Sequence, residues 1–224
     1  MLMLLQKPEL FCSLSRAYRR NVLSSLIAGV GLGLSLIVAI GAQNLFVLRQ
    51  GIRREHVLAV VAVCALSDVA LIALGVSGVG LAVQTVPWLV TAVRWAGALF
   101  LTGYGVLAAR RALRPSGRAL HAGRGAASAG LISTVSTCLA LTWLNPHVYL
   151  DTVFLLGSVA ATHGATRWAF ALGAALASAA WFSALGFGAR GIGTRLDDPR
   201  AWRVVDGVIA VVMLAIAVSL VVPG

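Results

Sequence analysis

Residues 142–151 read TWLNPHVYLD and decide how this chain folds, because they place a helix breaker and several polar groups inside a long apolar run. The mainly apolar stretch from 129 to 161 has 33 residues, and as one helix it would be roughly 50 Å long. The hydrocarbon core of a bilayer is only about 30 Å thick. Pro146 removes a backbone donor and clashes with the preceding turn. The sequence therefore predicts a membrane helix that is broken at Asn145–Pro146.

A weaker counterpart of this stretch, residues 41–48 (GAQNLFVL), lies in the first apolar run. Polar side chains at membrane depth are costly, so each one kept there has a structural or functional reason. Gln43, Asn44 and Asn145 can satisfy backbone groups freed at a helix break, or they can bind the α-amino and α-carboxylate groups of an amino acid. Both interpretations stay open. The carbonyl freed by Pro146 can also coordinate an ammonium or sodium ion.

The composition identifies an integral membrane protein. The 224 residues are 59% hydrophobic and only 11% charged, whereas a soluble domain carries about 25% charged residues. The net charge of +11 comes almost entirely from arginines that lie between apolar runs. This placement favours loops facing lipid headgroups and the cytoplasm over a nucleic-acid partner. Three cysteines and four scattered histidines show no metal-ligand spacing, so we expect no metal and no cofactor.

The apolar runs predict an all-α membrane protein with six transmembrane helices in two halves. An N-terminal tail (1–20) precedes the first half (21–109), and a basic connector (110–128) leads to the second half (129–224). Three spans in each half make the halves inverted repeats, which is a common plan among transporters. The predicted spans cover residues 21–48, 57–83, 88–109, 129–161, 167–189 and 204–222.

The arginines also predict an orientation. The loops after the first, third and fifth spans and the flanking residues hold twelve arginines, while the other side of the membrane has five basic residues. The positive-inside rule places the twelve-arginine side in the cytoplasm and both termini outside. The basic residues of the N-terminal tail oppose this assignment. A small-residue pair, Gly29 and Gly33, predicts close helix packing in the first span.

Asp68 is the clearest candidate for a functional group within a span. A carboxylate at mid-span costs about 2.5–3.5 kcal/mol on insertion scales. One interpretation is a buried ion pair with Arg94 of the next span, which would hold the two helices together. The other is a cation or proton site that faces a wet cavity. The two are compatible if a cationic substrate competes with Arg94 for Asp68.

Asp151 follows the Pro146 break and is the second acidic candidate. It is either a carboxylate at headgroup level or a partner of Asp68 in one cavity. Two carboxylates in a site of low dielectric attract a cation, and their mutual repulsion favours proton uptake when the site is empty. Tyr149 and Trp143 offer aromatic faces to a cation, although aromatic side chains in a span more often belong to the core.

Five motifs together resemble the LysE-type family of lysine and arginine exporters, and the resemblance covers about residues 21–222. They are residues 41–47, 49–54, 64–69, 94–97 and 141–151. Family members usually have Pro where this chain has Ala42, which predicts a softer first break here. The acidic and Asn-Pro positions of the family correspond to Asp68, Asp151, Asn145 and Pro146.

The resemblance implies a multi-pass exporter of L-arginine or L-lysine in the bacterial inner membrane, driven by the membrane potential and by protons. A bare pore would import these cations, because moving one charge outward costs about 2.3 kcal/mol per 100 mV. A neutral amino acid or a metal cation as substrate remains the alternative. An intramembrane enzyme is disfavoured, because neither a nucleophile–base pair nor a metal motif is present. The sequence leaves self-association into a homo-oligomer open.

Overall fold

The computed structural model describes residues 8–39, 41–78, 87–113, 130–193 and 199–222, and all regular structure within them is helical. The basic connector lies almost entirely outside this part of the chain. The helices are α1 (Pro8–Ile37), α2 (Ala42–Arg53), α3 (Val57–Val76), α5 (Pro87–Leu113), α7 (Leu131–Trp143), α8 (Pro146–Val148), the π-helix η2 (Tyr149–Leu155), α9 (Leu156–Thr162), the 3₁₀-helix η3 (Gly164–Thr166), α10 (Arg167–Gly193) and α11 (Pro199–Val221).

Five helical segments among the described residues are long and apolar enough to cross a membrane. The prediction of an all-α, multi-pass membrane protein is therefore confirmed. A sixth continuous span and an inverted repeat stay predictions, because the apolar helix α7 (Leu131–Trp143) is shorter than a span. The five segments are Ser15–Ile37, Val57–Val76, Thr91–Leu113, Gly164–Gly191 and Trp202–Val221.

Two helices occupy the first predicted span, residues 21–48, so this span is interrupted. Helix α1 begins at Pro8, within the expected tail, and ends at Ile37, and α2 starts at Ala42. Asn44 stabilises this break by donating from Nδ2 to the carbonyls of Ile37 at 2.7 Å and Ala39 at 2.8 Å. An amide side chain thus satisfies two carbonyls that the helix leaves free, and no proline is needed for the break.

The second break lies where the sequence predicts it. Helix α7 ends at Trp143, and Asn145 caps the next helix by accepting a hydrogen bond from the backbone amide of His147 at 3.1 Å. Pro146 occupies the first turn of that helix, where its missing donor costs nothing. From Tyr149 the chain continues as π-helix η2, a conformation that is rare and often found at functional sites.

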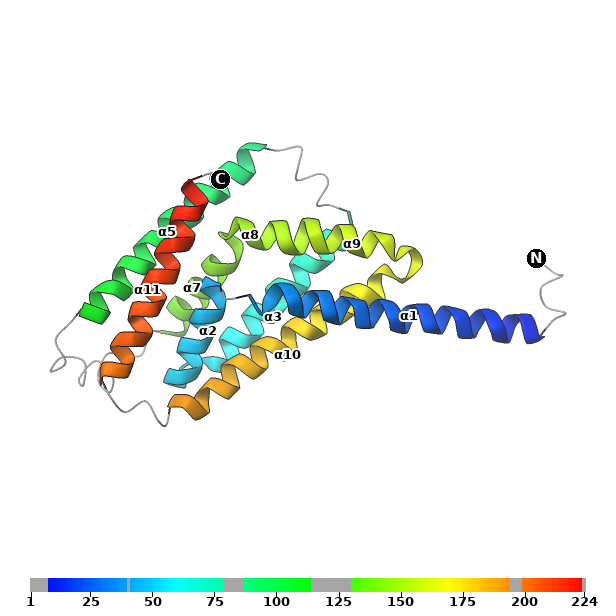
Figure 1. Cartoon of the computed structure of the whole chain (residues 1–224), viewed down its shortest axis with the longest axis horizontal. Helices are drawn as coiled ribbons and strands as arrows, with labels where there is room; N and C mark the ends of the chain where they lie inside the picture. The colour runs from blue at the N-terminus through cyan, green and yellow to red at the C-terminus, as the bar shows by residue number, and fades with distance from the viewer. Residues whose placement is uncertain (1–7, 40, 79–86, 114–129, 194–198, 223–224) are drawn as a thin grey trace.

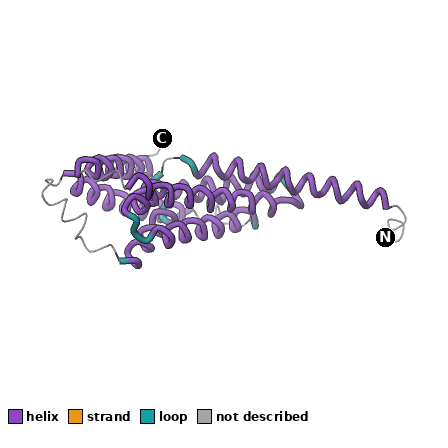
Figure 2. The backbone as a smooth tube through the Cα atoms, turned by 90° about the horizontal axis from the view of Figure 1, so that it is seen from below, coloured by secondary structure: helices purple, strands orange, loops and turns teal. Residues whose placement is uncertain are grey.

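Two long helix pairs flank the broken helices. Helix α1 lies along α10, and α11 lies along α5, as Figure 1 shows; α1 extends beyond the other helices at its N-terminal end (Figure 2). The predicted small-residue pair lies in the first of these contacts. A Cβ on Gly29 would collide with the backbone of Phe170, and one on Gly33 would lie 3.0 Å from the Cα of Ala174. Both glycines therefore permit the close approach of α1 and α10.

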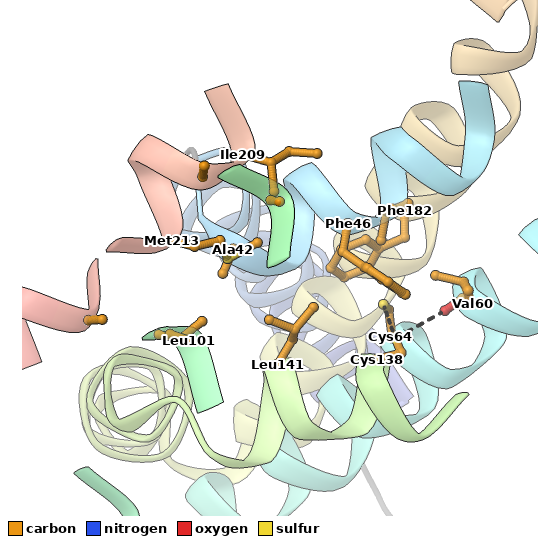
Figure 3. Close-up of a cluster of buried hydrophobic side chains, with 14 of the residues drawn as sticks. Ala42, Phe46, Val60, Cys64, Leu101, Cys138, Leu141, Phe182, Ile209 and Met213 are labelled. Atoms are coloured by element: carbon orange, nitrogen blue, oxygen red, sulfur yellow. Dashed lines mark hydrogen bonds between the residues drawn. The ribbon is translucent and has the colours of Figure 1, made fainter. Parts of the chain in front are cut away.

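A buried apolar cluster joins α2, α3, α5, α7, α10 and α11. Figure 3 shows Phe46 and Phe182 beside the Cys64–Cys138 pair, with Leu141 below them. A second cluster packs α3 and α9 against α1 and α10. A Cβ on Gly75 would lie 2.7 Å from the carbonyl oxygen of Val153, so η2 and α3 are also in close contact. The residues around both breaks are thereby held against α3 and α10.

The basic segments expected on one side of the membrane lie together. Arg54 donates from Nη2 to the carbonyl of Arg190 at 3.1 Å, which joins the end of α2 to the end of α10. Arg203 donates from Nε to the carbonyl of Ala112 at 2.8 Å, which joins the start of α11 to the end of α5. The common location agrees with the arginine count. That this side is cytoplasmic stays a prediction.

Candidate functional site

Asp68 is buried inside a strongly apolar span. It is 6% exposed and is the only acidic residue in α3, a span with a mean hydropathy of 2.7. The hydroxyl of Ser178, from α10, donates to Asp68 Oδ2 at 2.6 Å. A charge-assisted hydrogen bond of this length stabilises an anionic carboxylate that burial would otherwise disfavour. The hydroxyl therefore helps to hold a carboxylate within the bilayer.

The ion pair between Asp68 and Arg94, one of the two interpretations of the sequence, is not formed. Arg94 instead donates from Nε to the carbonyl of Leu220 and from Nη2 to that of Val221 at 3.1 Å. These carbonyls end α11, where a cation also interacts favourably with the helix dipole. The salt bridges found among the described residues involve Arg49, Arg53 and Arg111 but not Asp68. Among the described residues, Asp68 thus has no ion pair with an arginine, a lysine or a histidine.

The first helix break is connected to Asp68 through α10. Trp181 donates from Nε1 to Asn44 Oδ1 at 3.3 Å, and Trp181 lies one turn beyond Ser178 on the same face of α10. The side chain of Asn44 therefore joins the break between α1 and α2 to the helix that hydrogen-bonds Asp68. Its three contacts support the structural interpretation of this amide.

The second helix break reaches α3 beside the same carboxylate. Trp143, the last residue of α7, donates from Nε1 to the hydroxyl of Ser67 at 3.2 Å. Tyr149 donates from its hydroxyl to the carbonyl of Trp143 at 2.8 Å across the break. The hydrogen bonds of Tyr149 and Asn145 thus stabilise the backbone conformation around Pro146. One hydrogen bond thus joins each break to a helix that carries one member of the Asp68–Ser178 pair.

Gln43 and two cysteines lie near this pair. The side-chain nitrogen Nε2 of Gln43 is buried without a hydrogen-bond partner. Cys64 lies one turn before Asp68 on α3, and its Sγ is 3.3 Å from the Sγ of Cys138 on α7 (Figure 3). Both thiols are free and buried. For Gln43 the structural and the substrate-binding interpretations therefore both stay open.

Asp151 lies on η2 and is only partly buried. Gly75, two turns beyond Asp68 on α3, is one residue that η2 approaches closely, through Thr152 and Val153. Two turns correspond to about 10 Å along a helix axis. No hydrogen bond or ion pair joins the two carboxylates among the described residues. A cavity shared by Asp68 and Asp151 therefore stays a prediction.

Three polar residues of this site were missed from the sequence: Ser67, Ser178 and Trp181. Ser178 and Trp181 lie in the run ALASAAW, where small residues predict helix packing and hide the polar positions. A buried carboxylate requires a donor, but no signal in the sequence pairs Ser178 with Asp68, which is 110 positions away. Among the described residues no cluster of three His, Cys, Asp or Glu side chains could hold a metal ion.

Comparison with known proteins connects this arrangement to transport. The family model for LysE type translocators matches residues 34–224. A protein of Mycobacterium tuberculosis (strain ATCC 25618 / H37Rv), provisionally named as an amino-acid transporter, is 49% identical over 185 residues, which are 83% of this chain and 90% of that protein. No solved structure matches the chain.

Two further relatives carry specific names. The arginine exporter protein ArgO of Salmonella typhi is 40% identical over 201 residues, which cover 89% of this chain and 94% of that exporter. The lysine exporter LysE of Corynebacterium glutamicum is 36% identical over 229 aligned positions. The alignment covers 88% of this chain and 98% of that exporter. The chain therefore belongs to the family of LysE type translocators, which are transporters and not enzymes, as the resemblance of its motifs implied.

Proposed function

We propose that the protein exports basic amino acids, L-arginine or L-lysine, across the bacterial inner membrane and that inward movement of protons drives this export. The observation that carries the proposal is the Asp68 carboxylate, which is 6% exposed and hydrogen-bonded to Ser178 within a span. A buried anion without a neighbouring cation attracts a positively charged solute or a proton. The names of the lysine and arginine exporters among its relatives support the same substrates.

Proton coupling follows from the direction of transport. A cell interior that is negative opposes the exit of a cation by about 2.3 kcal/mol per charge and 100 mV. An exporter has to couple this step to another gradient, and a carboxylate in the pathway can exchange a substrate cation for a proton. In this proposal Asp68 takes that role, and alternating access between the two halves of the protein exposes it to each side in turn.

Asp151 is the second acidic group in the proposal. It lies next to the break at Pro146, where a change in helix geometry would alter its access to water. If Asp151 receives the proton or the cation after Asp68, Asp151→Asn lowers the export rate and leaves the amount of protein in the membrane unchanged. Wild-type export by this variant would restrict the acidic pathway to Asp68.

Export of a neutral amino acid is the main alternative. The M. tuberculosis relative is named only as an amino-acid transporter, without a substrate. A buried carboxylate favours a cationic solute, because a neutral amino acid would leave its negative charge uncompensated. A metal cation is less favoured, since the described residues contain no cluster of metal-ligating side chains.

Efflux from loaded cells tests the proposal. Cells lacking their own exporters are loaded with radiolabelled arginine, lysine or leucine and express either this protein or an empty vector. We expect export of arginine or lysine that stops when an uncoupler dissipates the proton gradient. Export of leucine alone would select the alternative substrate, and basic amino-acid export that survives full uncoupling would contradict proton coupling.

A further inference from the structure

A buried ionic cluster joins α2, α5 and α11 at the end of the molecule where the basic segments meet. Asp206 of α11 is 7% exposed and lies between two arginines. Its Oδ1 is 3.3 Å from Nη2 of Arg49 and 3.3 Å from Nε of Arg111. One carboxylate oxygen thus serves two guanidinium groups, and the cluster keeps an excess positive charge of one.

The arginines around the cluster differ in their partners and in their exposure. Arg53 is matched by Glu55, at 3.1 Å between Nε and Oε2. Arg203 donates to a backbone carbonyl. Arg49 differs in its burial, because its side chain is only 10% exposed. A buried charge that is incompletely paired carries a large desolvation cost. The fold retains that cost at Arg49, whereas the side chain of Arg111 is 31% exposed.

Four of the buried polar side-chain atoms without a hydrogen-bond partner belong to this cluster or its neighbours. They are Arg49 Nε, Gln50 Oε1, Tyr104 Oη and Arg111 Nη2. Arg111 Cζ is 5.8 Å from the centre of the Tyr104 ring. The Tyr104 ring in turn packs edge-on against Phe46, with centroids 6.2 Å apart, and Gln50 follows Phe46 by one turn on the same face of α2.

The unused atoms match the head group of an α-amino acid. Two guanidinium groups and a phenol can donate to a carboxylate, and arginine binds carboxylates in a favourable forked geometry. The amide oxygen of Gln50 can accept from an ammonium group. The carboxylate of Asp206 already occupies part of this donor set, which shows that a carboxylate fits between the two arginines.

We propose that Arg49, Gln50, Tyr104 and Arg111 bind the α-carboxylate and α-amino group of an amino acid, and that Asp206 occupies this site while it is empty. The inference rests on the proposed function for the identity of the solute and extends it by assigning a head-group site separate from Asp68. An entering amino acid replaces Asp206 at the arginines. This removes the ionic contacts of α11 with α2 and α5, while the bound carboxylate joins α2 to α5.

Pairs of compounds that differ only in the carboxylate test the inference. The full-length protein is placed in phosphatidylcholine nanodiscs, and its thermal unfolding is followed with L-arginine or agmatine, L-lysine or cadaverine, and L-leucine or 3-methylbutylamine. Where a pair binds, we expect the amino acid to raise the unfolding temperature at a concentration about tenfold lower than its amine does. The reason is that the carboxylate adds hydrogen bonds to charged donors.

Variants of the cluster sharpen this test. Arg111→Gln and Arg49→Lys are expected to abolish the preference for the amino acid over its amine, and Asp206→Asn to tighten amino-acid binding by removing the internal competitor. Arg110→Gln is the matched control, because Arg110 is exposed and adjacent to Arg111 on α5. Arg49→Lys keeps the positive charge and removes the forked guanidinium. It therefore tests the site even if the loss of charge in Arg111→Gln disturbs folding.

The outcomes separate this inference from the proposed function. Export of arginine with equal binding of arginine and agmatine would overturn the head-group site and leave the function standing. A carboxylate preference only in the leucine pair would support the site and contradict the basic substrates. Stabilisation by added phosphatidylglycerol, with none by any amino acid, would overturn the assignment to amino acids in favour of a lipid headgroup.

Discussion

The hydroxyl of Ser178 on α10 lies 2.6 Å from Oδ2 of Asp68 on α3, and both residues are buried. The two residues are 110 positions apart in the sequence and come from the two different halves of the chain. Their hydrogen bond therefore connects a span that carries an acid with a span that packs against the first break. Loss of this hydrogen bond would therefore weaken the contact between α3 and α10.

Ser178→Ala tests the contribution of this hydroxyl. Loss of a hydrogen bond to a charged group costs about 1.5–3 kcal/mol, so we expect a roughly tenfold or larger fall in export while the protein still folds. Transport kinetics in vesicles measure the effect. Ser158→Ala is the control, since Ser158 is exposed and its hydroxyl donates to the carbonyl of Leu155 in the preceding turn. Unchanged export by Ser178→Ala would mean that Asp68 does not depend on this donor.

Arg94→Gln distinguishes a structural from a functional arginine. Arg94 joins α5 to the C-terminal carbonyls of α11, so we expect a loss of stability of about 1–3 kcal/mol and an unchanged preference among substrates. Thermal unfolding of the purified protein and efflux per folded molecule measure the two quantities. A variant with wild-type stability and no export would instead show that Arg94 takes part in transport.

Asn44 maintains the break between α1 and α2 through its two donated hydrogen bonds. Asn44→Asp removes these donors and keeps an oxygen for Trp181. We therefore expect Asn44→Asp to be destabilised at least as much as Asn44→Ala, by about 1–3 kcal/mol for each carbonyl left unsatisfied. Chemical denaturation in mild detergent compares them. If Asn44→Asp were as stable as the wild type, the bond from Trp181 would be the one that matters.

Gly29→Ala tests the contact between α1 and α10. The added Cβ would collide with the backbone of Phe170, and forcing an extra carbon into a packed contact costs about 1–3 kcal/mol. Gly31→Ala is a matched control on the same helix, because nothing lies within 4 Å of its Cβ position. Thermal unfolding should therefore separate the variants, and equal midpoints would contradict the close packing of these helices.

The sequence predicted best where one residue type dictates the backbone. Pro146 cannot continue a helix, and the break lies next to it. The first break was placed inside a single expected span, because no proline marks it and the determining contacts of Asn44 depend on tertiary geometry. Pairing Asp68 with Arg94 assumed that adjacent spans face each other there, whereas Arg94 contacts α11, 126 positions away.

The arginines near the helix ends show a second limit of sequence reasoning. Their positions predicted which segments share one side, and the contacts of Arg54 and Arg203 agree. The sequence interpretation treated them all as loop charges facing headgroups. It missed that Asp206 pairs with two of them, Arg49 and Arg111, because such a pair depends on a carboxylate that approaches from a distant helix.

Counterflow of radiolabelled arginine and lysine by Asp68→Asn, with Asp68→Glu beside it, tests the role of the buried carboxylate most directly. Asparagine keeps the size and the hydrogen bond but cannot carry a charge or exchange a proton. The account predicts that Asp68→Asn reaches the membrane in normal amount and exchanges neither amino acid, while Asp68→Glu retains part of the activity. Wild-type counterflow by Asp68→Asn would contradict the account.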